Sequence, residues 1–98
     1  MGFPTVNIPL TDSSVSGIYA ALVRAGVEEL RAAVYADQRR KILEAHILDS
    51  TVDLYGKAIE IELIDKIRED IPFATEEELK RAIADDVAKV QEYFKKTL

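Results

Sequence analysis

The chain has 98 residues, a formal net charge of −5 and no cysteine, which fits one small domain, residues 1–98, with a single hydrophobic core. The acidic charge argues against a protein that binds nucleic acid or an anionic membrane, and the lack of cysteine excludes disulfides and thiolate zinc sites. No apolar run is long enough to cross a bilayer and the first residues lack a signal peptide, so we expect a cytoplasmic protein with no membrane partner.

The N-terminal residues predict an edge strand followed by a hairpin. Residues 1–10 contain Pro4 and Pro9, and because proline cannot donate to a sheet ladder, this segment is expected to be an edge or irregular strand. After a polar loop at residues 11–14, a strand is predicted from Ser16 to Arg24. Ala25 and Gly26 then predict a tight turn, since glycine readily adopts a positive φ.

The return strand of the hairpin is predicted from Val27 to Ala36. Its residues alternate between two faces, with Leu30, Ala32 and Val34 on one face and Glu29, Arg31 and Ala33 on the other. Alanine and glutamate weaken the β pattern, so a helix from Val27 to Tyr35 remains an alternative.

The next strand carries two polar side chains within an apolar segment. It follows a polar turn at residues 37–40 and contains Ile42, Leu43, Ala45, Ile47 and Leu48. Period-two alternation places Glu44 and His46 on one face and the apolar Leu43, Ala45 and Ile47 on the other. A second polar turn, at residues 49–53, ends the strand.

The clearest alternation runs from Lys57 to Ile64, after Gly56, and predicts a strand with Ile59, Ile61 and Leu63 on one face. Lys66 to Asp70 is predicted to form a single helical turn. It would end at Ile71 and Pro72, because a residue before proline avoids the α region.

The C-terminal segment predicts an amphipathic helix from Glu76 to Lys95. Thr75 and Glu78 form a capping-box pattern, and a stripe of apolar residues recurs every three or four positions: Leu79, Ala82, Ile83, Val87, Val90 and Phe94. Five antiparallel strands followed by this helix predict a mainly β fold, a small barrel or curled sheet covered by the helix.

Five segments, in order, resemble the riboflavin kinase (flavokinase) domain. The centre of that domain is matched by Glu-Ala-His-Ile-Leu-Asp at 44–49 of this chain, followed by Asp-Leu-Tyr-Gly-Lys at 53–57, which it resembles. The other matches are Gly-Phe-Pro-Thr-Val-Asn at 2–7, Ser-Gly-Ile-Tyr-Ala at 16–20, and Ile-Arg-Glu at 67–69 with Phe73. The resemblance implies a six-stranded antiparallel Greek-key barrel with the C-terminal helix packed outside.

The resemblance implies a Mg²⁺-dependent phosphotransferase that converts riboflavin to FMN with ATP. Glu44 matches the glutamate that accepts the proton of the riboflavin 5′-hydroxyl. Thr5 and Asn7 match the threonine and asparagine that ligate the metal, and on an extended segment both side chains point to one side. From the residues alone, Glu44 would be a solvent-facing strand glutamate, and Thr5 and Asn7 would satisfy nearby backbone groups.

The remaining site residues are also implied by the resemblance. Arg68 matches an arginine beside the flavin, and Pro4, Tyr55 and Gly56 match the nucleotide side. From spacing alone, Arg68 reads as a surface arginine and Tyr55-Gly56 as a turn. His46, the only histidine, is expected to be structural or solvent-facing. The expected partners are riboflavin, FMN, ATP and ADP, together with an adenylyltransferase domain on another chain.

Two nucleotide-side segments of the family have no match. One is a strand and a basic, glycine-bearing loop before the Gly-Phe-Pro-Thr segment. The other is Asn-Ile-Gly followed by Pro-Thr, in whose place this chain has residues 35–41. Arg39, Arg40 and Lys41 are candidate donors to phosphate in place of these segments. The alternative function is therefore a non-catalytic module, with the same barrel, that binds flavin, nucleotide or a protein partner.

Overall fold

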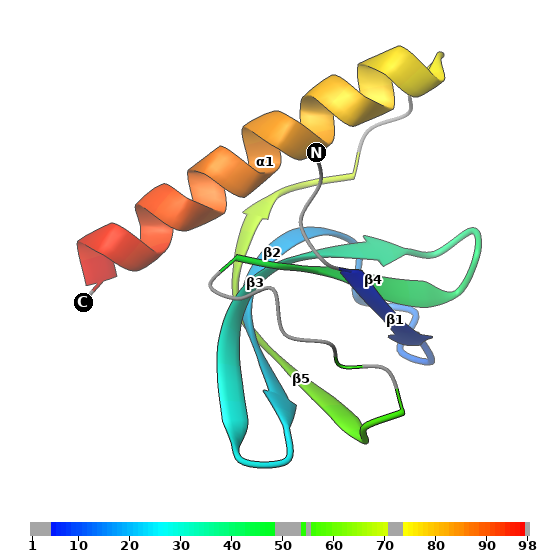
Figure 1. Cartoon of the computed structure of the whole chain (residues 1–98). Coiled ribbons are helices and arrows are strands. Elements are labelled where there is room, and N and C mark those ends of the chain that lie inside the picture. The colour runs from blue at the N-terminus through cyan, green and yellow to red at the C-terminus, as the bar shows by residue number, and fades with distance from the viewer. Residues whose placement is uncertain (1–4, 49–53, 55, 71–73, 98) are drawn as a thin grey trace.

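The structure is a computed structural model and describes residues 5–48, 54, 56–70 and 74–97. In this part of the chain, five strands precede one long helix (Figure 1). The elements are β1 (Thr5–Pro9), β2 (Gly17–Ala25), β3 (Glu28–Asp37), β4 (Ile42–Ile47), β5 (Ile59–Arg68) and α1 (Glu76–Thr97). The mainly β fold with a C-terminal helix is confirmed.

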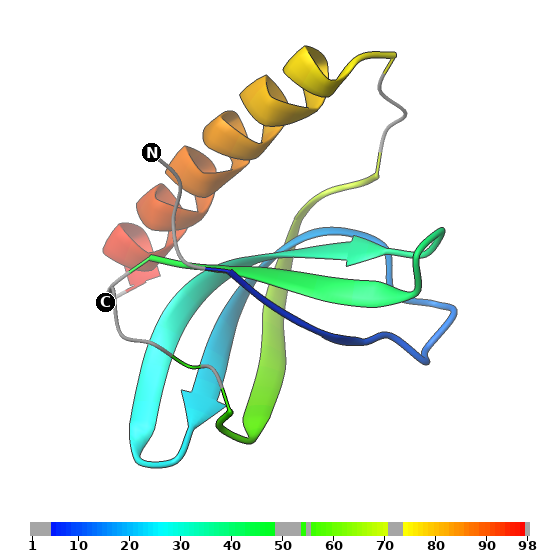
Figure 2. The same cartoon turned by 45° about the vertical axis from the view of Figure 1, so that its right-hand side comes forward.

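All strand pairs are antiparallel, and the sheet order is β1-β4-β3-β2-β5. Strands β2, β3 and β4 follow one another as neighbours, and β1 lies beside β4, which is a Greek-key arrangement. The sheet is strongly curled, as Figure 2 shows. Among the described residues β1 and β5 are its two edges, so the sheet is barrel-like but not closed. It has the five strands predicted from the residues, whereas the resemblance implied six.

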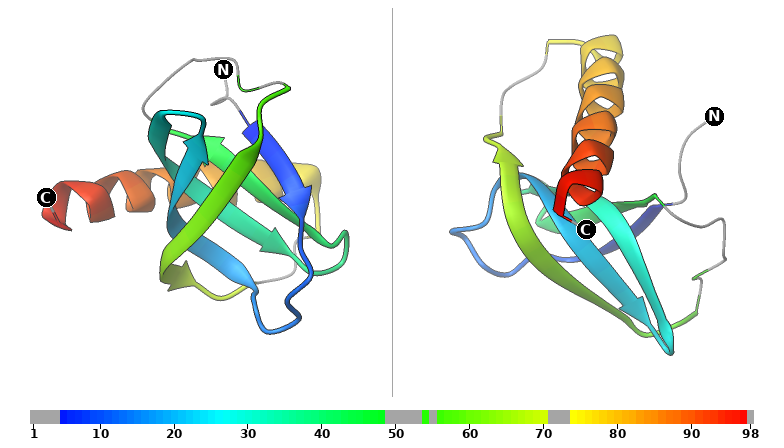
Figure 3. Two further views of the ribbon diagram at one scale, coloured as in Figure 1. Left: turned by 90° about the horizontal axis from the view of Figure 1, so that it is seen from below. Right: turned by 90° about the vertical axis from the view of Figure 1, so that its left-hand side faces the viewer.

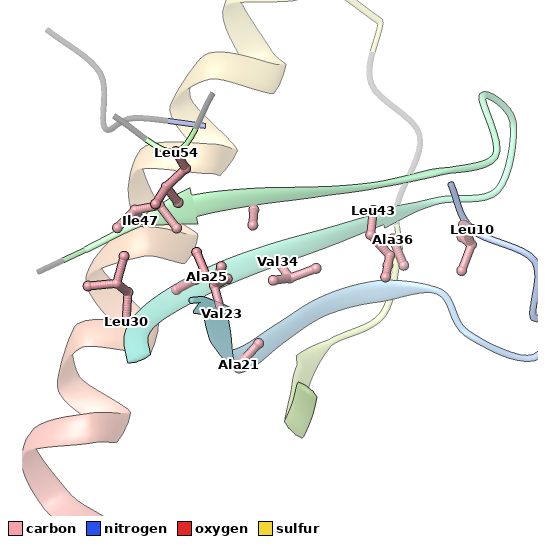
Figure 4. Packing of buried hydrophobic residues seen from close by; sticks show 12 residues of the cluster. Leu10, Ala21, Val23, Ala25, Leu30, Val34, Ala36, Leu43, Ile47 and Leu54 are labelled. Carbon is pink, nitrogen blue, oxygen red and sulfur yellow. The ribbon is translucent and has the colours of Figure 1, made fainter. Parts of the chain in front are cut away.

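The inner face of the curled sheet holds the larger hydrophobic core (Figure 4). Val23, Val34 and Ile47 are fully buried there, and they alternate along their strands with outward-facing residues. Much of this face is alanine: Ala21, Ala25, Ala32, Ala36 and Ala45. Small side chains leave room for a tightly curled sheet, in which inward-facing positions often combine small and large residues.

The outer face of β2 and β3 packs against α1, as the end-on view in Figure 3 shows. The second core consists of Ile18, Ala20 and Ala33 from the strands and Val87, Val90 and Phe94 from the helix. These helix residues belong to the predicted stripe, which therefore packs on the sheet. At the helix start, the Glu78 amide donates to Thr75 Oγ1 at 3.1 Å, and the Glu78 carboxylate accepts from the Ala74 amide.

The strand pairing contradicts one sequence prediction and decides between two alternatives for another segment. The helical turn predicted at Lys66 to Asp70 is wrong, because β5 continues to Arg68. Two register shifts in the pairing of β2 with β5 interrupt the alternation there, so a strand pattern is not visible in the sequence. The alternative helix over Val27 to Tyr35 is excluded, since β3 pairs with strands on both sides. Ile71 and Pro72 lie outside the described residues.

Gly17 determines how closely the end of β5 approaches β2. Its φ is +95°, and a Cβ atom at this position would lie 2.3 Å from the carbonyl oxygen of Arg68. Real Cβ atoms do not approach an oxygen that closely, and an L side chain at this φ is strained. Glycine therefore allows the chain to bring Arg68 beside the start of β2.

Candidate functional site

The pairing of β1 with β4 brings four polar residues together. Asn7 lies opposite Glu44, and Thr5 lies opposite His46. Val6 and Ile8 pack against the inner core, so all four polar side chains share the outer face. Directly opposed residues of an antiparallel pair have Cβ atoms about 4.5–5.5 Å apart. The structure thus places the two expected metal ligands next to the expected catalytic glutamate.

A cleft of about 400 Å³ lies in front of Glu44. The sheet side is lined by Glu44, Tyr35 and the turn between β3 and β4, and the opposite side by the N-terminal part of α1, including Leu79 and Ile83. Tyr35 is the partner of Glu44 on β3, so it faces the same side of the sheet. The volume lies within the range of small-molecule sites. The lining combines apolar side chains such as Leu79 and Ile83 with several charged ones.

Asp37 organises the turn beside Glu44. Its buried carboxylate accepts hydrogen bonds from the backbone amides of Arg39 and Arg40, at 3.0 and 3.1 Å, and from Arg40 Nε at 2.7 Å. Burial alone would raise the pKa of Asp37, but these hydrogen bonds outweigh it and lower the pKa. The fixed guanidinium then reaches Glu44, with Nη2 3.5 Å from Oε1.

The three side chains that are candidates to donate hydrogen bonds to phosphate differ in their surroundings. Arg40 is held by Asp37, and Lys41 Nζ donates to Gln38 Oε1 at 3.0 Å. The guanidinium of Arg39 lines the cleft and makes no hydrogen bond or ion pair within the described residues. Of the three, Arg39 is therefore the side chain best placed to bind an incoming anion.

Arg68 pairs with α1 instead of lining the cleft. Its Nε and Nη2 donate to the two carboxylate oxygens of Asp86, at 2.8 and 2.6 Å, and its Nη1 donates to the Glu69 carbonyl oxygen at 2.8 Å. The Asp86 side chain is 4% exposed and that of Arg68 is 19% exposed. Sequence reasoning missed Asp86, although its position three residues after Ile83 and four before Val90 puts this carboxylate on the apolar face of the helix.

His46 is largely buried beside Glu44. Its Nε2 atom lies 4.0 Å from Glu44 Oε2 and has no hydrogen-bond partner among the described residues. Burial lowers the pKa of His46, and the carboxylates of Glu44 and Asp86 oppose that effect. The sequence-based expectation of a structural or solvent-facing histidine did not include this contact with Glu44.

The nucleotide side is only partly described. Pro4 and Tyr55 lie outside the described residues, and Gly56 is exposed with a φ of +81°. Within the described ranges, no group of three or more His, Cys, Asp or Glu residues could hold a metal ion. No helix in this part of the chain combines the length and the apolar character that a membrane crossing needs. The expected cytoplasmic location stays a prediction.

A family model and the curated relatives of this chain carry the same name, riboflavin kinase. A family model named Flavokinase, riboflavin kinase, matches residues 1–94. The bifunctional riboflavin kinase/FMN adenylyltransferase of Escherichia coli K12 is 39% identical over 103 residues, and that of Haemophilus influenzae is 33% identical. Each alignment covers 96% of this chain and 33% of the relative. The chain thus spans about a third of the length of these relatives.

A solved structure shows the same fold. It is described as a macrolide-efflux protein from Streptococcus pneumoniae, and it matches with a TM-score of 0.74 at 23% identity. The match covers 93% of this chain and 33% of that chain. At this level of identity the likeness concerns the arrangement of the strands and the helix alone.

Proposed function

Because the chain belongs to the riboflavin kinase family, we propose that it transfers the terminal phosphoryl group of ATP to the 5′-hydroxyl of riboflavin, producing FMN and ADP. The observation that carries this proposal is the direct pairing of Asn7 with Glu44, whose side chain lines the cleft. The non-catalytic module, the alternative from the sequence, is not favoured by relatives that are named as kinases.

Glu44 would act as the general base. Its carboxylate accepts the proton of the 5′-hydroxyl while the hydroxyl oxygen bonds to the terminal phosphorus of ATP and the bond from that phosphorus to the bridging oxygen breaks. Since Glu44 lines the cleft, its carboxylate can meet a hydroxyl bound there. Arg40 Nη2 and His46 Nε2 lie on different sides of the carboxylate, 3.5 Å from Oε1 and 4.0 Å from Oε2.

Thr5 and Asn7 would hold a Mg²⁺ ion. A hydroxyl and an amide oxygen are hard neutral ligands, and Mg²⁺ keeps most of its shell as water and substrate phosphate, so a site without a carboxylate cluster fits this ion. When bound, the ion would neutralise part of the negative charge on the phosphates. The two residues would also fix the terminal phosphate on the side of Glu44.

The flavin would occupy the cleft between the sheet and α1. Tyr35, Leu79 and Ile83 offer a flat aromatic ligand an apolar wall. Because Arg68 pairs with Asp86 and does not line the cleft, we propose that it supports the flavin site indirectly, by holding α1 in place. Pro4, Tyr55 and Gly56 are proposed for the nucleotide side, and an adenylyltransferase remains the proposed partner.

The test is product analysis after the protein is mixed with riboflavin, ATP and Mg²⁺. The parent protein should form FMN, and Glu44→Gln should lose the activity while still quenching riboflavin fluorescence. Glu62→Gln is the matched control, because it changes an exposed strand glutamate far along the sheet from β4 and should keep the activity. Quenching by the parent protein without FMN formation would disprove the kinase and support the non-catalytic alternative.

A further inference from the structure

The side chain of His46 ends in a buried polar atom that forms no hydrogen bond with any described residue. Nε2 is inaccessible to solvent and makes no hydrogen bond within the described residues, and the side chain is only 12% exposed. A buried nitrogen that loses its hydrogen bonds to water costs free energy, so such atoms in folded proteins normally have a partner or a function. This atom therefore requires an explanation.

Water does not provide a convincing partner. The cavity beside His46 has a volume of about 10 Å³, at the lower limit for one water molecule. Four of its other lining residues are the apolar Ile18, Ala33, Ile83 and Val87. Asp86 also lines this cavity, but both of its oxygens accept from Arg68 and neither makes a hydrogen bond to His46 Nε2. So small and largely apolar a cavity is a poor site for a bridging water molecule.

Among the described residues, Glu44 is the acceptor with an oxygen near Nε2. Its Oε2 lies 4.0 Å from Nε2, and alternation on β4 keeps both side chains on one face. Its other oxygen, Oε1, faces Arg40 Nη2 at 3.5 Å. Both distances are longer than a good hydrogen bond, but hydrogen bonds of catalytic groups often tighten only when substrate is bound.

We propose that His46 is a positioning residue, whose Nε2–H donates to Glu44 Oε2 and, together with Arg40 on Oε1, fixes the orientation of that carboxylate. The catalytic consequence rests on the proposed function, since it matters only if Glu44 is the base. A glutamate side chain has several rotatable bonds, and holding both oxygens leaves the carboxylate less freedom before the hydroxyl arrives.

The hydrogen bond can be tested without any activity. His46 is the only histidine in the chain, so long-range ¹H–¹⁵N NMR spectra of the imidazole contain one set of signals. Above neutral pH the neutral ring should carry its proton on Nε2, and Glu44→Gln should shift the Nε2 signal or the balance of tautomers. A ring protonated on Nδ1, with Nε2 unprotonated, would overturn the proposal. An Nε2–H signal that is unchanged by Glu44→Gln would do the same.

Kinetics test the positioning role. His46→Leu removes the donor and should lower kcat on the order of 10- to 100-fold, with little change in KM for riboflavin, because a displaced base affects the reaction more than binding. His46→Gln, whose amide donor lies near the position of Nε2, should restore most of kcat. The melting temperature of His46→Leu should not fall, since an unpaired polar atom is replaced by an apolar group.

The outcomes separate the two proposals. If His46→Leu keeps the parent kcat, the positioning role is refuted even if FMN is formed. If the parent protein forms no FMN, the proposed kinase function fails, and the NMR comparison still decides whether His46 orients Glu44.

Discussion

Asp86→Asn should be among the most destabilising single changes on the helix. The variant keeps the size of the side chain but removes the charge that receives two short hydrogen bonds from Arg68. Removing one partner of a buried ion pair costs about 3–5 kcal/mol, because the other charge is left uncompensated. Arg68 is 19% exposed and keeps its bond to the Glu69 carbonyl oxygen, so water can partly solvate it. We therefore expect the free energy of unfolding to fall by about 3 kcal/mol, the lower end of that range.

For a domain of this size, such a loss should lower the melting temperature by about 12 to 24 °C. Urea unfolding followed by circular dichroism gives the free energy directly. Glu62→Gln is the matched control, because the Arg24–Glu62 pair is equally short, at 2.7 Å, but its side chains are 38% and 53% exposed. Exposed pairs contribute at most about 1 kcal/mol.

If Asp86→Asn and Glu62→Gln lost the same amount of unfolding free energy, the reasoning from burial would be refuted. The double variant Arg68→Met/Asp86→Leu provides a second check. Since well-packed apolar residues often replace a buried ion pair without loss, it should recover most of the stability that Asp86→Asn loses.

Three further predictions concern packing and pH. Gly17→Ala should lower the melting temperature, because the new Cβ would meet a backbone carbonyl oxygen and φ is positive. In urea unfolding, Phe94→Ala should cost about 3–5 kcal/mol and the half-buried Ile83→Ala about 2; unchanged stability with an altered oligomeric state would instead place the helix at an interface between chains. Burial, and next the Asp70 carboxylate, raise the pKa of Tyr35 to about 12. Its folded pKa exceeds the unfolded value of 10, so its stabilising effect should be complete below pH 10 and lost up to about pH 12. Alkaline melting curves should show the parent losing stability relative to Tyr35→Phe in that window, and parallel curves would contradict this prediction.

Local patterns in the sequence predicted most of the elements. Alternation identified the faces of β3 and β4, and the capping residues and apolar stripe identified α1, because these signals depend on neighbours within a few positions. The end of β5 could not be predicted in this way. Its pairing with β2 contains two register shifts, and these depend on a partner strand that is distant in the sequence.

The candidate site depended on distant contacts. The sequence alone indicated that Thr5 and Asn7 share a face and that Glu44 and His46 share a face. Nothing local indicated that β1 would pair with β4 in the register that joins the two sets. The same limit applied to Asp86, whose partner Arg68 lies on another element. An aspartate on an apolar helix face was a usable signal for a buried partner, but it did not identify that partner.

The edge position of β1 has a consequence during protein synthesis. Its partner in the sheet is β4, and β2 and β3 lie between them in the chain. At the usual rates of translation, β1 is made on the order of seconds before β4 and has no partner in the sheet until then. An unpaired strand is a template for aggregation during that time. The exposed positions of β1 are Thr5, Asn7 and Pro9, two polar residues and one that cannot donate to a ladder. Pro9 therefore opposes pairing of this edge with other chains, and the polar Thr5 and Asn7 make its exposed side less apolar.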